Sequence, residues 1–179
     1  MLIFGILGSL LVLAALVWAV WIYNRLVRDR HRVLAAWSDI DVQLKRRHDL
    51  IPKLIEAVRG YTAYEQATLQ TLTALRTRSR QTDDPKQRGP MEAELSVGMH
   101  RLLALAEAYP DLKASSNFLE LQREITSVED FLQHARRYYN GAVRNLNTRI
   151  DSFPDLLLAR ALNYRYAAYF QLEDARDDR

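Results

Sequence analysis

Cysteine is absent from the 179 residues of this chain, which excludes a disulfide framework, a thiolate metal site and a cysteine nucleophile. Glycine is scarce, with six residues that stand singly, so the chain has no Walker A loop, GxGxxG turn or GxSxG elbow. The HExxH motif of zinc proteases is also missing. We therefore predict that the chain is not an enzyme and acts on no small-molecule substrate.

The four histidines lack the neighbours that a metal-binding bundle would need. A di-iron bundle places a Glu three residues before a His on each of two helices. The residues at that position are Arg28, Lys45, Val97 and Phe131, none of which is acidic. The sequence therefore predicts no metal site and no cofactor. Nucleic acid is not expected as a partner either, because the basic run at residues 76–80 has no interleaved aromatic residues.

Charged side chains are missing from the first 24 residues. Residues 1–23 are rich in Leu, Ile, Val and Ala, and as a helix they would span roughly 33 Å, which matches a hydrocarbon core of about 30 Å. Aromatic side chains that favour the headgroup layer end this stretch, at Trp18, Trp21 and Tyr23. A cleaved signal peptide is the alternative, but it would begin with basic residues and have a shorter apolar core. We predict an uncleaved transmembrane anchor.

Basic residues follow the anchor directly and set its predicted orientation. The first nine residues of the body contain Arg25, Arg28, Arg30 and Arg32 and a single acid. The positive-inside rule then places the N-terminus outside a bacterial inner membrane and the C-terminal body in the cytoplasm. Together with the three aromatic residues, these arginines form the predicted membrane interface. Membrane topology explains this basic excess more simply than nucleic acid does.

Beyond the anchor, apolar residues recur at heptad spacing, which is typical of long packed helices and coiled coils. The first seam predicts one helix over residues 24–80. Its apolar positions are Val33, Trp37, Ile40, Leu44, Ile51, Leu54, Val58, Tyr61, Leu72 and Leu75. Pro52 would kink this helix, and two helices that meet at residues 50–52 are the alternative. Gly60 would weaken it by about 1 kcal/mol relative to Ala.

Residues 81–90 contain two prolines, a glycine and no apolar side chain, and they predict a loop. Further helices are predicted over residues 91–109, 117–152 and 155–172, followed by a charged tail at 173–179. The predicted fold class is all-α, with an N-terminal transmembrane helix that continues into a long-helix antiparallel helical bundle over residues 24–172.

The helix over residues 117–152 has the most regular seam of the sequence, running from Phe118 to Phe153. Asn117 is its expected N-cap, with Glu120 completing a capping box. Asn140 is followed by Gly141, a pair that could form a hairpin turn, but the apolar seam continues through both residues and favours an unbroken helix.

Polar and aromatic residues in or beside the seams are candidates for interaction or for fixing register. Arg47 falls on the first seam, where a buried guanidinium needs an acid, and Glu124 or Glu129 is the expected partner. Asp41 and Lys45 are four residues apart, which favours a surface ion pair. The candidate set is Trp37, Asp39, Asp41, Arg47, Tyr139 and Asn140. A solvated face and internal packing are the alternative interpretations for these residues.

Several segments are similar to those of one protein family. They include AWSDIDVQLKRRHDLIPKL at residues 36–54, LALAEAYPDLKA at 103–114, and the pairs Asn117-Phe118 and Phe153-Pro154. Over residues 20–154 the chain resembles the LemA family. The resemblance implies a bacterial single-pass membrane protein with a helical-bundle domain and no recognised catalytic activity. Residues 155–179 depart from the family pattern, because the expected Asn-rich and Gly-rich continuation is missing.

The resemblance also bears on partners. One similar protein is needed for magnetosome membrane formation, and some family members are associated with a membrane zinc metalloprotease, which makes such a protease a candidate partner here. Our main hypothesis is a non-enzymatic scaffold or adaptor that contacts membrane lipid and self-associates as a homo-oligomer or binds another inner-membrane protein. A membrane-shaping or envelope-stress protein is one alternative, and a metal-binding bundle is another.

Overall fold

The structure, a computed structural model, describes residues 1–59 and 66–171, and within these ranges it contains helices and no β-strand. In chain order the elements are α1 (Leu2–Arg59), α2 (Gln66–Arg80), α3 (Pro85–Leu105), the 3-10 helix η1 (Ala106–Ala108), α4 (Pro110–Lys113), α5 (Ser116–Asp151) and α6 (Asp155–Ala161). The predicted all-α class is confirmed.

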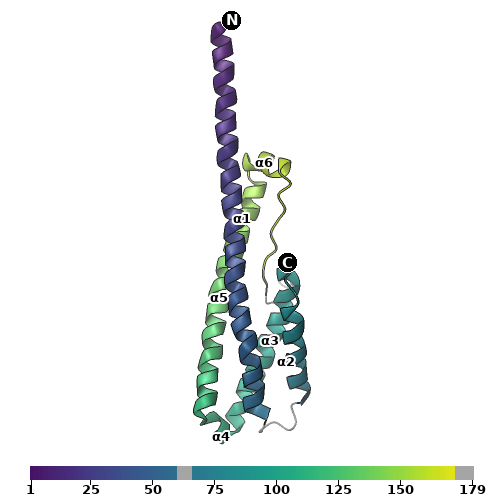
Figure 1. Cartoon of the computed structure of the whole chain (residues 1–179). Helices are drawn as coiled ribbons and strands as arrows, with labels where there is room; N and C mark the ends of the chain where they lie inside the picture. Colours follow the sequence, from purple (N-terminus) through teal and green to yellow (C-terminus); the bar gives the residue numbers. More distant parts are fainter. Residues whose placement is uncertain (60–65, 172–179) are drawn as a thin grey trace, which may run out of the picture.

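Helix α1 is a single rod of 58 residues, about 87 Å long at 1.5 Å per residue. Its N-terminal part projects beyond every other element, as Figure 1 shows. The apolar side chains of this part are exposed, from Ile3 at 74% to Val20 at 59%. Among the described helices, α1 is the one that is long and apolar enough to cross a membrane. The predicted continuation of the apolar helix into the body is confirmed.

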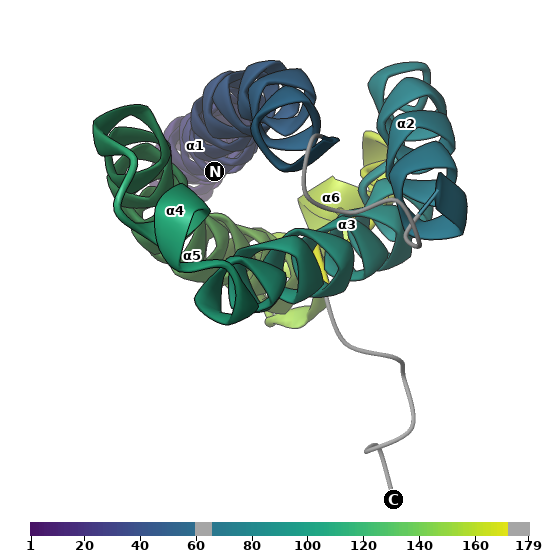
Figure 2. The ribbon, with the colours of Figure 1, turned by 90° about the horizontal axis from the view of Figure 1, so that it is seen from below.

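The body is built on an antiparallel pair, α1 and α5, with α2 and α3 packed beside them. Seen from below in Figure 2, α1, α2, α3 and α5 surround a common centre. The buried apolar residues form two clusters along this axis. The cluster near the anchor includes Ile22, Leu26, Ile40, Leu44, Leu132, Tyr139, Leu146 and Ala159. The cluster at the far end includes Ile51, Leu54, Leu72, Leu75, Leu95, Leu102, Phe118 and Ile125.

The prediction of one helix over residues 24–80 is wrong. Helix α1 ends at Arg59 and α2 begins at Gln66, and α2 packs mainly against α3. The heptad pattern does not distinguish two helices from one here, because Leu72 and Leu75 of α2 are buried in the same far cluster as the end of α1. The predictions for Gly60 and Tyr61 concern residues outside the described ranges. The alternative break at residues 50–52 is also wrong, since α1 continues through Pro52.

The predicted loop at residues 81–90 is too long. Asp84 caps α3, its carboxylate accepting a hydrogen bond from the Lys86 amide, and Pro85 occupies the first turn of the helix. This Asp-Pro pair is a strong start signal, because proline lacks only an N–H that the first turn leaves unpaired anyway. Helix α3 ends at Leu105 and is followed by η1, and Pro110 starts α4.

Helix α5 agrees with the predicted helix over 117–152 to within one residue and passes through Asn140 and Gly141, so the hairpin alternative is excluded. The capping box is wrong: the N-cap is Ser115, and no side chain caps the helix. The seam is buried from Phe118 to Ile150, but Phe153 is 78% exposed.

The last predicted helix, over 155–172, is much too long. Helix α6 ends at Ala161, and Asn163 adopts a left-handed conformation with φ of 53°. The Tyr164 amide donates to the Ala159 carbonyl and the Asn163 amide to the Arg160 carbonyl, which is the Schellman pattern that terminates helices. Residues 164–171 then run without helix along the bundle, as Figure 1 shows, and we call them the strap.

Candidate functional sites

The predicted membrane interface lies on α1 where the bundle begins. Trp18, Trp21 and Tyr23 are 41%, 53% and 48% exposed, while Ile22 between them is fully buried. The Arg25 guanidinium lies 4.4 Å from the centre of the Trp21 ring, a cation–π contact. An amphipathic ring beside a cation suits a headgroup layer, with phosphates on one side and acyl chains on the other. The other three arginines, Arg28, Arg30 and Arg32, are exposed on the next two turns.

A partly buried ion cluster lies at this end of the bundle. Arg149 of α5 donates from Nε to Asp29 of α1 at 2.5 Å and from Nη1 to Asp155 of α6 at 3.0 Å. Burial lowers the pKa of Arg149, but the hydrogen bonds and charges of the two aspartates outweigh it, so the pKa is raised overall. One guanidinium therefore joins three helices next to the anchor.

A second buried cluster separates the two apolar clusters of the core, and Arg47 lies at its centre with no exposed surface. Its guanidinium lies 3.0 Å from Glu92 of α3 and 3.0 Å from Glu129 of α5. Of the two partners expected for Arg47, Glu124 and Glu129, the structure pairs it with Glu129. Glu92 also accepts a hydrogen bond from Ser79 of α2 and lies 2.8 Å from Nε2 of His48. We call this cluster the polar layer; its members are Arg47, His48, Ser79, Glu92 and Glu129. It joins all four long helices of the bundle.

The neighbours of Glu92 stabilise its charged form. Burial raises the pKa of this carboxyl, but the hydrogen bond to His48, the charges of Arg47 and His48 and the hydrogen bond from Ser79 outweigh it, so the pKa lies below its usual value. A buried charge that loses its partner is destabilising by about 3–5 kcal/mol. The layer therefore favours one register of the four helices over slipped packings.

Pro52 leaves one backbone carbonyl of α1 without a helical partner. Residue 52 has no N–H to donate to the carbonyl of His48, four residues earlier. Nε of Arg76 on α2 donates to this carbonyl at 2.6 Å. Proline thus creates an acceptor that a neighbouring helix uses, which explains how α1 passes through Pro52 while α2 docks at that level.

Asp41 lies beside the polar layer. Its carboxylate pairs with Lys45 at 2.7 Å, which confirms the expected ion pair, and with Arg88 of α3 at 2.9 Å. Burial raises the pKa of Asp41, but the hydrogen bonds and charges of Lys45 and Arg88 outweigh it and lower the pKa overall. Asp39 lies on the exposed face of α1, so the structure does not bring it into this group.

The strap is held by two asparagines of α5. Asn147 donates to the Ala167 carbonyl and accepts from the Ala167 amide, at 3.0 and 2.9 Å. Asn140 makes the same pair of bonds with Phe170, also at 3.0 and 2.9 Å. Seven helical residues cover about 10.5 Å, and three extended residues cover about 10 Å, so the two asparagines match an extended chain that runs antiparallel to α5.

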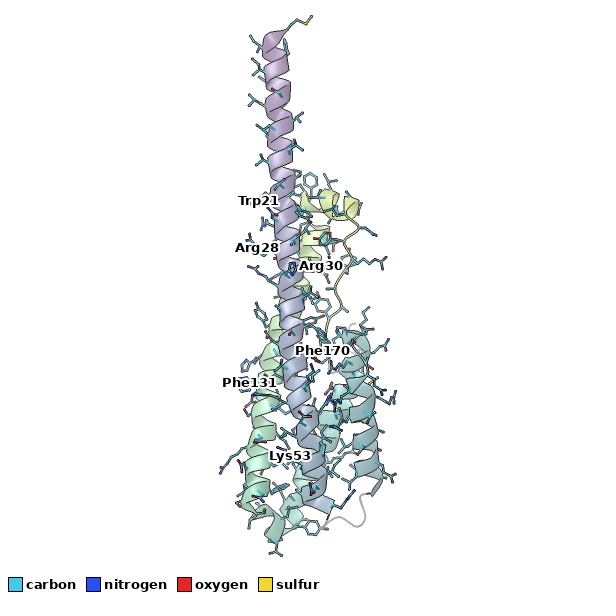
Figure 3. All side chains as sticks on the ribbon, in the orientation of Figure 1. Trp21, Arg28, Arg30, Lys53, Phe131 and Phe170 are labelled. Carbon is cyan, nitrogen blue, oxygen red and sulfur yellow. The ribbon has the colours of Figure 1, made fainter. Side chains whose placement is uncertain are left out.

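Aromatic packing completes the strap site. Phe170 is fully buried, its ring centre 5.5 Å from that of Trp37, and Trp37 lies 5.4 Å from the Tyr139 ring. In Figure 3 Phe170 lies beside α1, on the side where α2 and α3 pack. The Tyr139 hydroxyl donates to the Ala168 carbonyl at 2.7 Å, and burial, with a smaller effect of the Asp84 charge, raises its pKa to about 12. Gly89 of α3 lets the strap pack closely against this helix, because a Cβ at this position would overlap the carbonyl oxygen of Gln171.

The structure thus brings Trp37, Tyr139 and Asn140 together at the strap, and it places Arg47 and Asp41 in and beside the polar layer. Sequence reasoning missed Glu92 and His48 of the layer, and Phe170 of the strap. Glu92 could have been found, because it lies three and seven residues before the buried Leu95 and Met99, on the apolar face of α3. His48 carries the same signal, because it lies four residues after the buried Leu44 and three before the buried Ile51. Phe170 carries no such signal, because the strap is not helical.

Comparison with known proteins is consistent with this architecture. The model of the LemA family matches residues 36–179. The chain belongs to the LemA family. Protein LemA of Metamycoplasma hominis is 31% identical over 153 residues, which cover 84% of this chain and 69% of that protein. Magnetosome protein MamQ 2 of Paramagnetospirillum magneticum is 22% identical, covering 87% of this chain and 66% of its own length. Magnetosome protein MamQ of Magnetospirillum gryphiswaldense is 20% identical with the same coverage.

This LemA-family chain therefore spans about two thirds of the length of these relatives. None of their names denotes an enzyme. The family assignment, together with the exposed apolar part of α1, indicates a membrane-associated protein.

Proposed function

We propose that this LemA-family chain is a single-pass, membrane-anchored and non-enzymatic scaffold that self-associates, binds another inner-membrane protein, or does both. The observation that carries the proposal is the continuity of α1, which runs from the candidate membrane span into the bundle without a break. Bundle packing begins at Ile22, so no unpacked linker separates span and body. A body attached in this way would keep a fixed orientation to the bilayer, as a scaffold requires.

The burial and mutual pairing of the polar groups support a non-enzymatic role. Arg47, His48 and Glu92 are fully buried and directed at one another. Catalytic groups need a concave site in which they meet a substrate. The densest set of charges in the described bundle instead serves to join helices.

Self-association is supported by apolar side chains on the outside of the bundle. Phe131 and Tyr138 are seven residues apart on α5, two helical turns, and are 53% and 61% exposed. Figure 3 shows Phe131 on the outer side of α5. The seam of α1 does not contribute, because its residues from Val33 to Val58 pack inside their own chain. The α5 face is therefore the surface we assign to contacts between copies.

We further propose that the N-terminus lies outside and the bundle in the cytoplasm of a bacterial inner membrane. The four exposed or half-exposed arginines after Tyr23 support this orientation through the positive-inside rule.

In-cell crosslinking followed by mass spectrometry tests the scaffold proposal. We expect crosslinks between copies of the chain or to a foreign inner-membrane protein, with a membrane metalloprotease as one candidate. Substitution of both Phe131→Ser and Tyr138→Ser should reduce the links between copies, whereas Leu119→Ser, at the far end of α5 and 38% exposed, should leave them unchanged. Crosslinks confined to single chains at the native protein level would contradict the proposal.

A membrane-shaping role is a second candidate, and its support is the similarity to magnetosome proteins. In this role the oligomer would gather or bend lipid. Vesicles densely loaded with the full chain should then change shape under the electron microscope, and unchanged vesicles would exclude this role.

A further inference from the structure

Helix α6 returns to the level of the anchor. Because α5 runs antiparallel to α1, its C-terminal end lies next to the start of the bundle, and α6 lies across that end (Figure 1). Trp21 and α6 are at the same level of the molecule in Figure 3. Ile22 of α1 and Ala159 of α6 are both fully buried and belong to one cluster, against which Leu158 packs.

The length of the span fixes where this level lies in a bilayer. A hydrocarbon core of about 30 Å takes about 20 helical residues, and each headgroup layer adds roughly 5–7 Å. A helix that enters the core near Leu2 leaves it near Ile22. The element packed against Ile22 therefore lies at the depth of the headgroups, where Trp and Tyr side chains are also favoured.

The outer side of α6 has the character of a helix that lies in this layer. Asp155 and Ala159 face the bundle, four residues apart. Leu157 lies between them in sequence and about 200° from Asp155 around the helix axis, and it is 58% exposed. The flanking Phe153 and Leu162 are 78% and 43% exposed. The segment thus presents three large apolar side chains at membrane depth.

The charges around this segment fit a lipid surface. Arg160 of α6, Arg165 of the strap and Arg28 of α1 are exposed cations that phosphate groups can neutralise. The acid of α6, Asp155, points inward and is paired with Arg149. The exposed Asp151 accepts a hydrogen bond from the Tyr166 hydroxyl at 2.5 Å. Basic residues beside exposed leucines are the pattern of helices that lie in the membrane interface.

We propose that residues 153–162 form a second membrane contact, in which Phe153, Leu157 and Leu162 enter the boundary between headgroups and acyl chains. The inference rests on the proposed span of α1. Its consequence is attachment at two points: the anchor sets the depth of the bundle, and the segment 153–162 sets its tilt and its rotation about α1. The occupant of this surface is the lipid bilayer itself and not a second copy of the chain.

The absence of cysteine makes this proposal testable in the full chain, because single cysteines can be placed at will. Leu157→Cys is labelled with an environment-sensitive fluorophore, and the chain is reconstituted in vesicles of phosphatidylcholine and phosphatidylglycerol. Separate vesicle preparations carry a nitroxide either high on the acyl chain, at the depth expected for residue 157, or near the end of the acyl chain, at the depth expected for residue 11 in the middle of the span. Leu157 is exposed, so the substitution leaves the core intact. Leu11→Cys in the anchor is the positive control, and Leu119→Cys at the far end of α5 is the negative control.

We expect loss of fluorescence by nitroxide quenching at positions 157 and 11 and none at 119. Quenching at 11 without quenching at 157 would overturn the second contact and leave the span intact. A blue-shifted but unquenched probe at 157 would show that protein covers this surface, and it would also overturn the proposal. Absence of quenching at 11 would instead refute the span, and with it both the proposed function and the inference.

Discussion

At the scale of single residues, the structure shows how a helix tolerates an internal proline. Pro52 frees the His48 carbonyl, and Arg76 binds it from α2. We expect Arg76→Met to lower the free energy of unfolding by about 1.5–3 kcal/mol, the range for a hydrogen bond to a charged group. In a Pro52→Ala background the cost should shrink, because the backbone amide gained by that substitution can bind the carbonyl instead.

This double-mutant cycle is measured by urea unfolding of the detergent-solubilised chain. Arg78→Met is the matched control, since Arg78 is exposed on the same helix. An equal loss from Arg76→Met in both backgrounds would show that Arg76 acts through something other than the carbonyl that Pro52 frees.

The polar layer should make the stability of the fold depend on pH in the acidic range. The pKa of Glu92 is lower in the folded chain than the ordinary 4.5. A depressed carboxyl pKa stabilises the fold fully above pH 4.5, and this stabilisation is lost as the pH falls below 4.5 through the folded-state pKa. Glu92→Gln should therefore lower stability at pH 7 and flatten its decline in acid, as followed by urea unfolding midpoints. The exposed Glu94→Gln should change neither, and an unaltered decline in Glu92→Gln would contradict the assignment.

At the scale of elements, the heptads of the sequence predicted which residues are buried better than where helices end. The Phe118 to Ile150 seam of α5 was predictable because one uninterrupted period of apolar residues fixes one helix. The break after Arg59 was not, because a heptad pattern reports burial and says nothing about chain direction. The end of α6 depends on Asn163 in a left-handed conformation, and asparagine at this position is a weak signal that the leucines before it concealed.

The apolar pattern also predicted only part of the candidate sites, because it reports which residues are buried and not which segments meet. Arg47 was predictable because a charged residue on an apolar seam needs a partner. The sequence left Glu124 and Glu129 as its possible partners on α5, and the structure selects Glu129. The strap was not predictable, because its backbone bonds to Asn140 and Asn147 join segments 20 to 30 residues apart and need no particular residue type at Ala167.

The strap leads to a prediction at this scale. Replacing both Asn140 and Asn147 by Ala removes four backbone hydrogen bonds and should release residues 164–171 from the bundle. Chymotrypsin, which cuts after Tyr and Phe, should then remove the C-terminus faster than in the unchanged chain. Asn145→Ala is the control, because Asn145 is exposed on the same helix. Equal cleavage rates for all three chains would show that aromatic packing alone holds the strap.

At the scale of the whole molecule, α1 joins the span and the bundle without a linker, so insertion of Gly-Pro after Val27 should do more than uncouple them. It would break α1 between the buried Leu26 and Val33, and displace Ile22 and Leu26 from their positions against α5 and α6. We expect a lower melting temperature of the bundle together with normal membrane insertion, measured by circular dichroism and by membrane fractionation. An unchanged melting temperature would argue against a rigid rod.

Orientation is also a property of the whole molecule. With the bundle in the cytoplasm, protease added to intact spheroplasts should spare it, and protease added to inverted membrane vesicles should digest it. Digestion in spheroplasts would reverse the proposed topology and remove the role assigned to the arginines that follow the anchor.

The central claim is that the anchored chain works as a self-associating scaffold. Light scattering of the full chain in detergent, corrected for the mass of bound detergent, tests it most directly. One chain has a mass of 20.8 kDa. The account predicts a protein mass of two or more chains at micromolar concentration, reduced toward one chain by Phe131→Ser and Tyr138→Ser together. A mass of one chain for the unchanged protein under these conditions would contradict it.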